Sequence, residues 1–262
     1  MKATQSDHYV LSVKLRSDKI SSYEAYPFCL PVVHHLQELE LHPAVTFVVG
    51  ENGSGKSTLL EAIAVAWGFN PEGGTKNFRF NTRISHSVLH EYLRLVKGVK
   101  RPRDGFFLRA ESLFNLASEI EHLDKEPSFG PPIINSYGYT SLHEQSHGES
   151  FFAVLMHRFG GQGFYVLDEP EAALSPSRQL AMLARIHELV KKRSQFVIAT
   201  HSPLLMAYPN AWIYQVSERG YERVALEQTE HYVVAKRFLN DPHRQLARFL
   251  RTLPDPDEDP GT

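Results

Sequence analysis

Hydrophobic and polar positions along the chain follow two spacings, one typical of β-strands and one typical of α-helices. Short apolar runs rich in β-branched and aromatic residues predict strands at 9–15, 45–49, 106–108, 164–167, 195–199, 212–216 and 223–226. Apolar residues three and four positions apart predict helices at 32–41, 59–66, 81–96, 112–123, 151–159, 177–190 and 231–250, the last interrupted near Pro242. Because strands and helices alternate from residue 164 onward, the pattern predicts an α/β fold.

The middle of the chain departs from this alternation. Residues 70–145 are predicted to form a largely helical lobe, inserted into a single domain that spans residues 1–262. In the predicted helix 177–190, the side chains expected to face inward are those of Leu180, Leu183, Ile186 and Val190. The tail 254–262 is rich in Pro and Asp and is expected to be disordered.

Composition and charge narrow the classes of protein that fit. A net charge of −2 argues against a strongly basic nucleic-acid binder, although a local basic patch such as 97–103 stays compatible with it. The single cysteine, Cys29, cannot form an internal disulfide, so a reducing, cytoplasmic setting is expected; its apolar neighbours predict that it lies in the core. No apolar run approaches the roughly 20 residues of a membrane span and nothing resembles a signal peptide, so no direct membrane insertion is expected.

The first motif that carries chemistry follows the predicted strand 45–49. Residues 50–58 read Gly-Glu-Asn-Gly-Ser-Gly-Lys-Ser-Thr and match the P-loop (Walker A) pattern G-x-x-x-x-G-K-[ST], with a strand before it and a helix after it. Glycines let backbone N–H groups turn toward phosphate oxygens, Lys56 would reach the β- and γ-phosphates, and the Ser57 hydroxyl would bind Mg²⁺. The residues predicted to bind the nucleotide here are Gly50, Asn52, Gly53, Ser54, Gly55, Lys56, Ser57 and Thr58.

A second motif ends the predicted strand 164–167 with two acids, as a Walker B strand does. In P-loop proteins the first acid at such a strand end helps to hold Mg²⁺, which assigns Asp168 as a metal ligand. Glu169 is then placed to orient and deprotonate the attacking water. The alternative is a strand that ends in an ordinary polar turn. This alternative is less favoured because the same chain also carries a P-loop.

A third motif follows the strand 195–199, where Thr200-His201-Ser202-Pro203 begins. His201 sits just past the carboxyl end of a strand, where α/β sheets bind ligands. A lone histidine at this place is often structural, but after the two preceding motifs it predicts a γ-phosphate sensor. Ser175-Pro176 and Ser202-Pro203 each predict the capped start of a helix.

A fourth segment, residues 145–150, precedes the apolar helix 151–159. Ser146 and Gly148 at a helix N-terminus predict either an ordinary helix cap or a second anion site. One chain that holds one triphosphate has little use for two such sites, whereas two chains that face each other do.

In this order the four segments resemble the ABC ATPases, and among them the soluble RecF-like and SMC-like branch often labelled AAA-type ATPase domains. The resemblance spans about residues 9–216 and implies a P-loop NTPase fold with a mixed central sheet. It implies that Ser146, Gly148 and Glu149 form a signature motif that contacts ATP on a second subunit of a head-to-tail homodimer. It also implies that 171–175 is the D-loop at the dimer interface and that His201 is the switch histidine.

Three features depart from the family pattern. The usual signature Leu-Ser-Gly-Gly-Gln is changed by Gln145, His147 and Glu149. The Q-loop position, expected to approach the metal, falls on Glu111 in place of a glutamine. The aromatic residue that stacks on adenine could be Tyr23, Tyr26 or Phe28, of which Tyr26 is chosen.

The leading hypothesis is therefore an ATPase that uses ATP and Mg²⁺ and closes into a dimer. Two further hypotheses concern its work: a machine of DNA maintenance or defence that clamps DNA, supported by Lys97, Lys100, Arg101 and Arg103, and the motor subunit of a membrane transporter. A GTPase is disfavoured because the base-reading motif N-K-x-D is absent.

Overall fold

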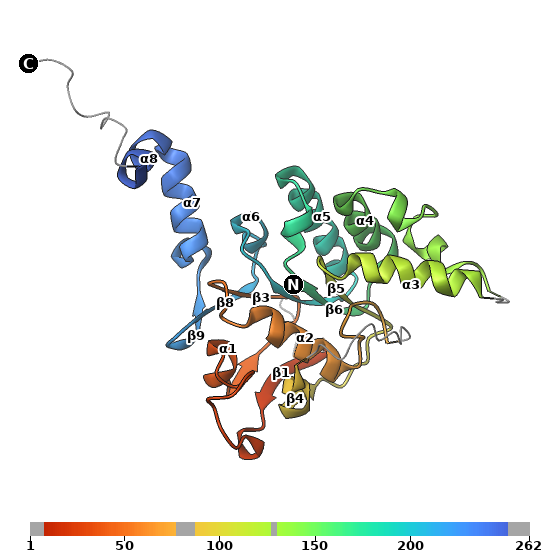
Figure 1. The fold of residues 1–262 in the computed structure, drawn as a ribbon, viewed down its shortest axis with the longest axis horizontal. Coiled ribbons are helices and arrows are strands. Elements are labelled where there is room, and N and C mark those ends of the chain that lie inside the picture. Colours follow the sequence, from red (N-terminus) through yellow and green to blue (C-terminus); the bar gives the residue numbers. More distant parts are fainter. Residues whose placement is uncertain (1–7, 77–86, 127–129, 251–262) are drawn as a thin grey trace, which may run out of the picture.

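A six-stranded sheet forms the centre of the molecule in the computed structural model, which describes residues 8–76, 87–126 and 130–250 (Figure 1). Its strand order is β5 (Asp104–Arg109), β6 (Gly163–Asp168), β7 (Gln195–Ala199), β3 (Val45–Gly50), β8 (Trp212–Ser217) and β9 (Gly220–Val224). The first five strands are parallel and β9 is antiparallel to β8, so the sheet is mixed, as expected. The carboxyl ends of β3, β6 and β7 consequently lie at the same edge.

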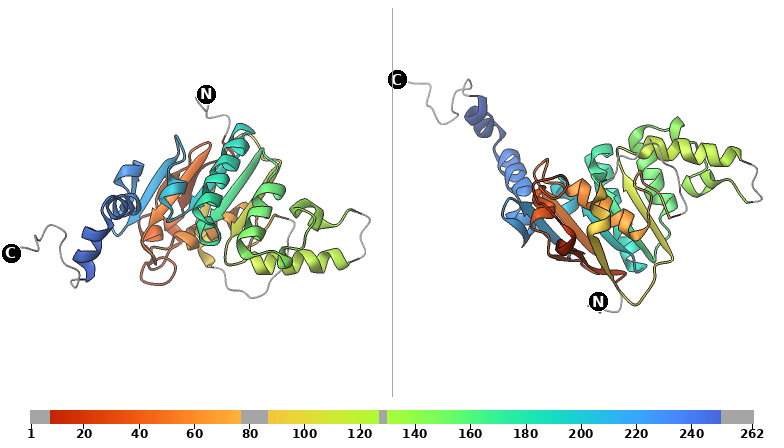
Figure 2. Two further views of the ribbon diagram at one scale, coloured as in Figure 1. Left: turned by 90° about the horizontal axis from the view of Figure 1, so that it is seen from above. Right: turned by 60° about the horizontal axis from the view of Figure 1, so that its bottom comes forward.

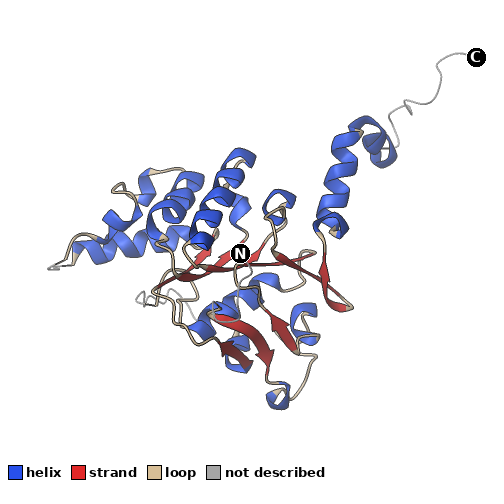
Figure 3. Ribbon diagram, turned by 180° about the vertical axis from the view of Figure 1, so that it is seen from behind, coloured by secondary structure: helices blue, strands red, loops and turns tan. Residues whose placement is uncertain are grey.

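A second, antiparallel sheet faces the first across the helix α2 (Lys56–Trp67), with α1 (Pro31–His34) beside it (Figure 1). Its order is β2 (Glu38–Glu40), β1 (Val10–Leu15) and β4 (Leu93–Lys97). The helices α3 (Leu113–Lys125), α4 (His147–Ala153), α5 (Pro176–Lys191) and α6 (Pro203–Met206) cover the opposite face of the central sheet (Figure 3). Successive side chains of β3 point to opposite faces of the sheet and so contribute to the hydrophobic core on each face. Phe47 packs toward these helices and Val48 packs toward α2.

The remaining elements are short turns and a C-terminal pair of helices. The 3₁₀ helices are η2 (Ser17–Lys19), η3 (Val88–Tyr92), η4 (Ile133–Tyr137), η5 (Leu142–Glu144), η7 (Pro170–Ala173) and η8 (Leu226–Gln228), and η6 (Val154–Arg158) is a π-helix. The helices α7 (Glu230–Asn240) and α8 (Pro242–Leu250) follow β9 and project from that end of the sheet, with α7 in contact with α6 (Figures 1 and 2). In the described part of the chain, no helix is long and apolar enough to cross a bilayer.

The predicted strands before residue 217 are all present, but several helix predictions were wrong. Residues 32–41 form only the single turn of α1 and then β2, because Leu39 pairs with β1 between two exposed glutamates. Of the predicted helix 81–96, residues 81–86 lie outside the described part, and 87–96 form η3 and strand β4. A short apolar run fits a strand or a helix equally well, and pairing with β1 decides for the strand here.

Residues 70–145 do not form one helical lobe. Their described part contributes β4 and β5 to the two sheets, and its helices α3, η4 and η5 follow β5. The inward face of α5 was predicted in part: Ile186 is buried and Leu183 and Val190 pack against the core, but Leu180 is 55% exposed. Met182 and Leu189 are buried in addition.

Three smaller predictions have mixed outcomes. Cys29 is exposed and not a core residue. The last strand is β9, which begins three residues and ends two residues before the predicted 223–226. The break at Pro242 is confirmed, since this proline begins α8, and the tail 254–262 lies outside the described residues.

Candidate functional site

The glycine-rich loop lies between the carboxyl end of β3 and the start of α2. Gly50 has no room for a side chain, because a Cβ atom there would lie 2.6 Å from the Val216 carbonyl oxygen. Gly55 begins α2 in a left-handed conformation, and a Cβ atom there would lie 2.7 Å from Val32. The loop geometry therefore requires glycine at both positions, as the P-loop pattern demands.

The Lys56 ammonium group points into this loop. It donates hydrogen bonds to the carbonyl oxygens of Gly50 and Glu51, at 2.9 and 2.8 Å. Burial lowers the pKa of Lys56, and an anion in the loop would act in the opposite direction and favour the charged form. A cavity of about 230 Å³ lies beside the loop, and its lining residues are Leu30, Asn52, Gly53, Gly55, Lys56, Ser57, Thr58 and Glu169.

The side chains of Ser57 and Asp168 meet at this cavity's edge. Ser57 Oγ donates to Asp168 Oδ1 at 3.0 Å, and Arg109 Nε lies 3.3 Å from Asp168 Oδ2. Burial raises the pKa of Asp168 to about 6, although Arg109 and Ser57 partly offset this effect. A buried carboxylate beside a hydroxyl supplies the hard oxygen ligands that Mg²⁺ prefers.

Protein side chains alone do not complete a metal site here. Within the residues that the structure describes, no cluster of three or more His, Cys, Asp or Glu side chains could hold a metal ion. The pair Ser57 and Asp168 therefore fits a Mg²⁺ whose other ligands are phosphate oxygens and water. Glu111, the predicted Q-loop residue, is exposed and pairs at 3.3 Å with Arg109, the same guanidinium that pairs with Asp168; its charge contributes to the raised pKa of Asp168.

Glu169 and His201 lie next to each other at the same edge of the sheet. Glu169 has a left-handed backbone (φ 47°) and its N–H donates to the Ala199 carbonyl at the end of β7. Its Oε1 atom is 3.5 Å from His201 Nε2. Burial lowers the pKa of His201, and the nearby Lys56 charge lowers it further, so the ring is neutral at pH 7.

Glu171 connects the turn after β6 to the histidine. Its Oε1 atom accepts a hydrogen bond of 2.5 Å from the His201 backbone N–H, and burial raises the pKa of the Glu171 carboxyl. The backbone of His201 is thereby tied to the segment 171–175. Movement of one would displace the other.

The predicted signature segment begins α4 and does not line the cavity beside the P-loop. The carboxylate of Glu149 accepts hydrogen bonds from the Ser146 N–H and hydroxyl, at 3.0 and 2.6 Å, so the two form a capping box. Ser146 and Glu149 are exposed. Gly148 packs against η7, where a Cβ atom would lie 2.4 Å from the Ala173 carbonyl oxygen.

Tyr26, the predicted adenine-stacking residue, lies with Leu30 on the loop before α1. Tyr26 is 64% exposed and does not line the cavity, whereas Leu30 does line it. The role of Tyr26 as the adenine-stacking residue stays a prediction.

Two polar residues of the site, Arg109 and His231, belong to none of the four motif segments. Arg109 is the last residue of β5, and the parallel register places it beside Asp168, the last residue of β6. Its position at a strand end next to an acid-bearing strand was a usable signal. His231, on α7, lies 2.9 Å from His201 through their ring nitrogens, and no sequence motif announces it.

Comparison with known proteins agrees with the motifs. The family model described as "AAA domain" matches residues 20–105, and the model described as "AAA domain, putative AbiEii toxin, Type IV TA system" matches residues 133–207. The DNA replication and repair protein RecF of Colwellia psychrerythraea is 36% identical over 66 residues, which is 25% of this chain and 16% of that protein. The matched segment thus covers under a fifth of the RecF length.

Two solved structures are similar to the whole fold. The protein cbiO1 of Clostridium perfringens, described as part of the ABC transporter complex cbiONQ, has a TM-score of 0.50 at 15% identity, covering 93% of this chain and 99% of its own. The SMC head domain of Thermotoga maritima has a TM-score of 0.45 at 15% identity, covering 83% and 98%. At this identity the cbiO1 likeness concerns the fold alone.

Fold and motifs together define the class as an ABC/AAA-like P-loop ATPase domain. The RecF match, over a quarter of this chain, agrees with the predicted resemblance to the RecF-like branch of that class.

Proposed function

We propose that this chain binds and hydrolyses ATP with Mg²⁺, and that ATP closes two copies into a head-to-tail dimer that hydrolysis reopens. The observation that carries this proposal is the convergence of Lys56, Ser57–Asp168 and Glu169–His201 on one edge of the sheet. ADP and phosphate would be the products. The single cysteine supports a cytoplasmic setting for this work.

Positioning and charge neutralisation would account for most of the catalysis. Lys56 and the loop amides would hold the β- and γ-phosphates. Ser57 and Asp168 would hold Mg²⁺, which supplies positive charge against the phosphate oxygens. Glu169 would orient the attacking water and accept its proton, while His201 donates a hydrogen bond to the γ-phosphate.

The second copy would complete the site with its Ser146 segment. Ser146 is exposed at the start of α4 and is absent from the lining of its own chain's P-loop cavity, which supports a role toward another molecule. Its hydroxyl, bonded to Glu149 in the single chain, would exchange that partner for a phosphate oxygen. The exposed N-terminal turn of α4 adds backbone N–H groups that favour an anion.

Two variants test this proposal. Glu169→Gln should bind ATP, lose hydrolysis and accumulate as a dimer, measured by phosphate release and by light scattering after size exclusion. Lys56→Ala should lose ATP affinity by at least about tenfold, because it removes a charged hydrogen bond to the phosphates. Glu222→Gln, an exposed change on β9, is the control and should behave as the wild type. A Glu169→Gln protein that stays monomeric in saturating ATP would contradict the dimer mechanism.

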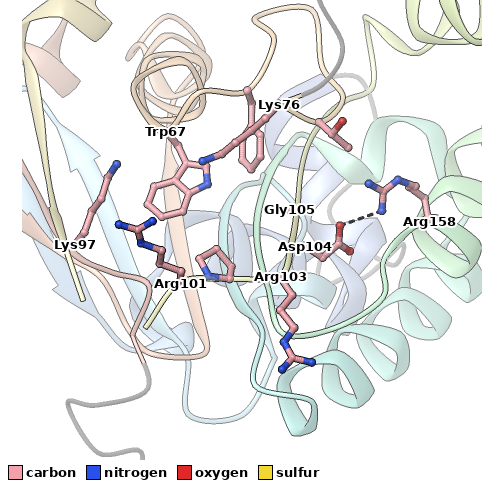
Figure 4. Close-up of a pocket in the computed structure, with 11 residues that line it drawn as sticks. Trp67, Lys76, Lys97, Arg101, Arg103, Asp104, Gly105 and Arg158 are labelled. Carbon is pink, nitrogen blue, oxygen red and sulfur yellow. Dashed lines mark hydrogen bonds and ion pairs between the residues drawn. The ribbon is translucent and has the colours of Figure 1, made fainter. Parts of the chain in front are cut away.

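A second candidate function, a nucleic-acid machine in DNA maintenance or defence, is favoured by a basic cavity of about 570 Å³ (Figure 4). The cations that line it include Lys76, Lys97, Arg101 and Arg103. The Lys76 and Lys97 ammonium groups lie 4.5 and 4.7 Å from the centre of the Trp67 ring. Burial lowers the pKa of Lys76, and the charge of Lys97 lowers it further, so an anion between them would be stabilising.

Among the described residues that line this cavity, cations outnumber acids. Asp104 is the only acid among the described residues that line it, and its carboxylate pairs with Arg158 at 2.9 Å (Figure 4). The segment 77–86, which follows Lys76, contains no Asp or Glu. Arg103 also lines a neighbouring cavity with Lys191, Lys192 and Arg193. The cations therefore continue past a single phosphate site, which suits the repeated charges of a nucleic-acid backbone.

DNA binding across a salt series tests this candidate. A fluorescein-labelled duplex of about 20 base pairs is titrated with wild type and with the double variant Lys97→Gln/Arg101→Gln. Loss of two phosphate contacts should weaken binding by at least about tenfold and reduce the salt slope by roughly 2. Lys236→Gln/Arg237→Gln removes two exposed cations from α7 and should leave binding unchanged. Equal affinity of wild type and the Lys97/Arg101 variant would exclude this surface.

A further inference from the structure

His231 contacts the candidate γ-phosphate sensor from outside the motif-bearing segments. Its Nε2 atom lies 2.9 Å from His201 Nδ1, and the two ring centres are 5.0 Å apart. His231 occupies the first turn of α7, whose start is fixed by Thr229, a fully buried residue that caps the helix. The contact therefore depends on an anchored part of α7.

The surroundings of Nε2, the other nitrogen of the His201 ring, indicate which of the two histidines donates the hydrogen bond in this contact. His201 Nε2 is buried and lies 3.5 Å from Glu169 Oε1. A carboxylate oxygen can only accept, so the arrangement with a proton on His201 Nε2 is favoured over one with a bare lone pair facing the carboxylate. A neutral ring with its proton on Nε2 has an acceptor at Nδ1, and His231 must then donate from its own Nε2.

We propose that His231 is a positioning residue that holds His201 in the tautomer with its proton on Nε2. The inference rests on the proposed ATPase function, in which that same N–H donates to the γ-phosphate. Without the donor at His231, His201 could carry its proton on Nδ1 and would present a lone pair to an anionic phosphate. Such an arrangement would repel the ligand instead of binding it.

The surroundings of the pair fit two neutral rings. Burial lowers the pKa of both His201 and His231, and the charge of Lys56 lowers both further. Glu169 acts in the opposite direction on His201, as Glu230 does on His231. A neutral pair shares one proton in one hydrogen bond, so the identity of the donor determines the tautomer.

Replacing His231 by two residues of nearly equal shape distinguishes a role in positioning His201 from a role in packing alone. His231→Gln can donate a hydrogen bond to His201 Nδ1, whereas His231→Glu, when ionised, can only accept and would force the proton onto Nδ1. We expect kcat for ATP hydrolysis to fall in the order wild type, Gln, Ala, Glu. The Glu variant should lose at least about tenfold with KM changed less than about twofold. His243→Glu introduces the same charge at an exposed histidine of α8 and should leave kcat unchanged.

Nitrogen-15 NMR of the histidine rings gives the second readout. The wild type should show His201 protonated at Nε2, and His231→Glu should show it protonated at Nδ1. An unchanged tautomer in His231→Glu, or equal kcat for the Gln and Glu variants, would overturn the inference. The NMR result requires no turnover, so it decides the role of His231 even if the wild type fails to hydrolyse ATP, which would overturn the proposed function alone.

Discussion

Glu169 holds a backbone conformation that residues with a side chain adopt at a cost. Its φ and ψ of 47° and 52° place it in the left-handed region, directly after Asp168 at the end of β6. The conformation turns the chain so that the Glu169 carboxylate faces His201 while its N–H still bonds to Ala199. Strain of this kind concentrates where a side chain must point in one direction for function.

Replacing Glu169 by glycine should therefore stabilise the protein while it abolishes hydrolysis. Glycine adopts this conformation without strain, and we expect the free energy of unfolding to rise by roughly 0.5–1 kcal/mol. The half-exposed contact with His201 contributes little that would be lost. Urea unfolding at pH 7.5 measures the change, and Glu169→Gln, which keeps the strain, is the matched control. A glycine variant less stable than the glutamine variant would show that the conformation carries no strain.

At the scale of elements, one buried glutamine joins the two sheets. The Gln195 side chain at the start of β7 accepts hydrogen bonds from the N–H groups of Tyr9 and Val10, both at 3.0 Å. Its amide donates to the carbonyl oxygens of Val10 and His42, at 2.8 and 3.0 Å. The residue is fully buried, so these backbone groups have little access to water as a substitute.

Gln195→Leu should consequently destabilise the fold strongly. The substitution replaces the carboxamide with an apolar side chain of similar size and leaves four backbone hydrogen-bonding groups without this partner, so we expect a loss of about 3 kcal/mol or more. Gln37→Leu, on an exposed position before β2, is the control and should change stability by less than about 0.5 kcal/mol. Chemical denaturation with fluorescence detection measures both. A Gln195→Leu variant as stable as the control would show that the sheets are held by apolar packing alone.

How well the sequence predicted an element depended on how local its signal was. The strands β3, β6 and β7 are buried on both faces and carry continuous apolar runs, so their ends, and the motifs placed there, could be located. Strand β4 could not be located, because its pattern also fits a helix and only pairing with β1 selects the strand.

The residues that were missed depend on contacts between distant segments. Arg109 reaches Asp168 through the register of two neighbouring strands, and His231 reaches His201 across 30 positions of sequence. Neither contact leaves a spacing pattern within one element. The motif residues themselves were identifiable because phosphate chemistry fixes their types and their order.

At the scale of the whole molecule, the two candidate sites occupy opposite edges of the central sheet. Lys56, Asp168 and His201 lie where β3, β6 and β7 end, whereas the basic cavity includes Asp104 and Gly105, where β5 begins. A ligand in the basic cavity would therefore leave the P-loop edge accessible. The exposed start of α4 is likewise free to meet another molecule.

A composite site between two copies can be tested by mixing two inactive variants. Ser146→Arg would damage the segment that a chain lends to its partner, and Lys56→Ala would damage the phosphate site that it keeps. Each variant alone should lose hydrolysis. In a mixed dimer, however, the Ser146→Arg chain keeps its P-loop and meets an intact Ser146 on the Lys56→Ala chain.

An equal mixture should then recover up to about a quarter of wild-type activity, because half of the dimers are mixed and each has one intact site. Mixing Lys56→Ala with Glu169→Gln provides the control. Those two changes damage the part of the site that each chain keeps, so no mixed dimer has an intact site and no activity should return. Full hydrolysis by Ser146→Arg alone, or equal recovery in both mixtures, would mean that each chain completes its own site and that the dimer is not required for catalysis.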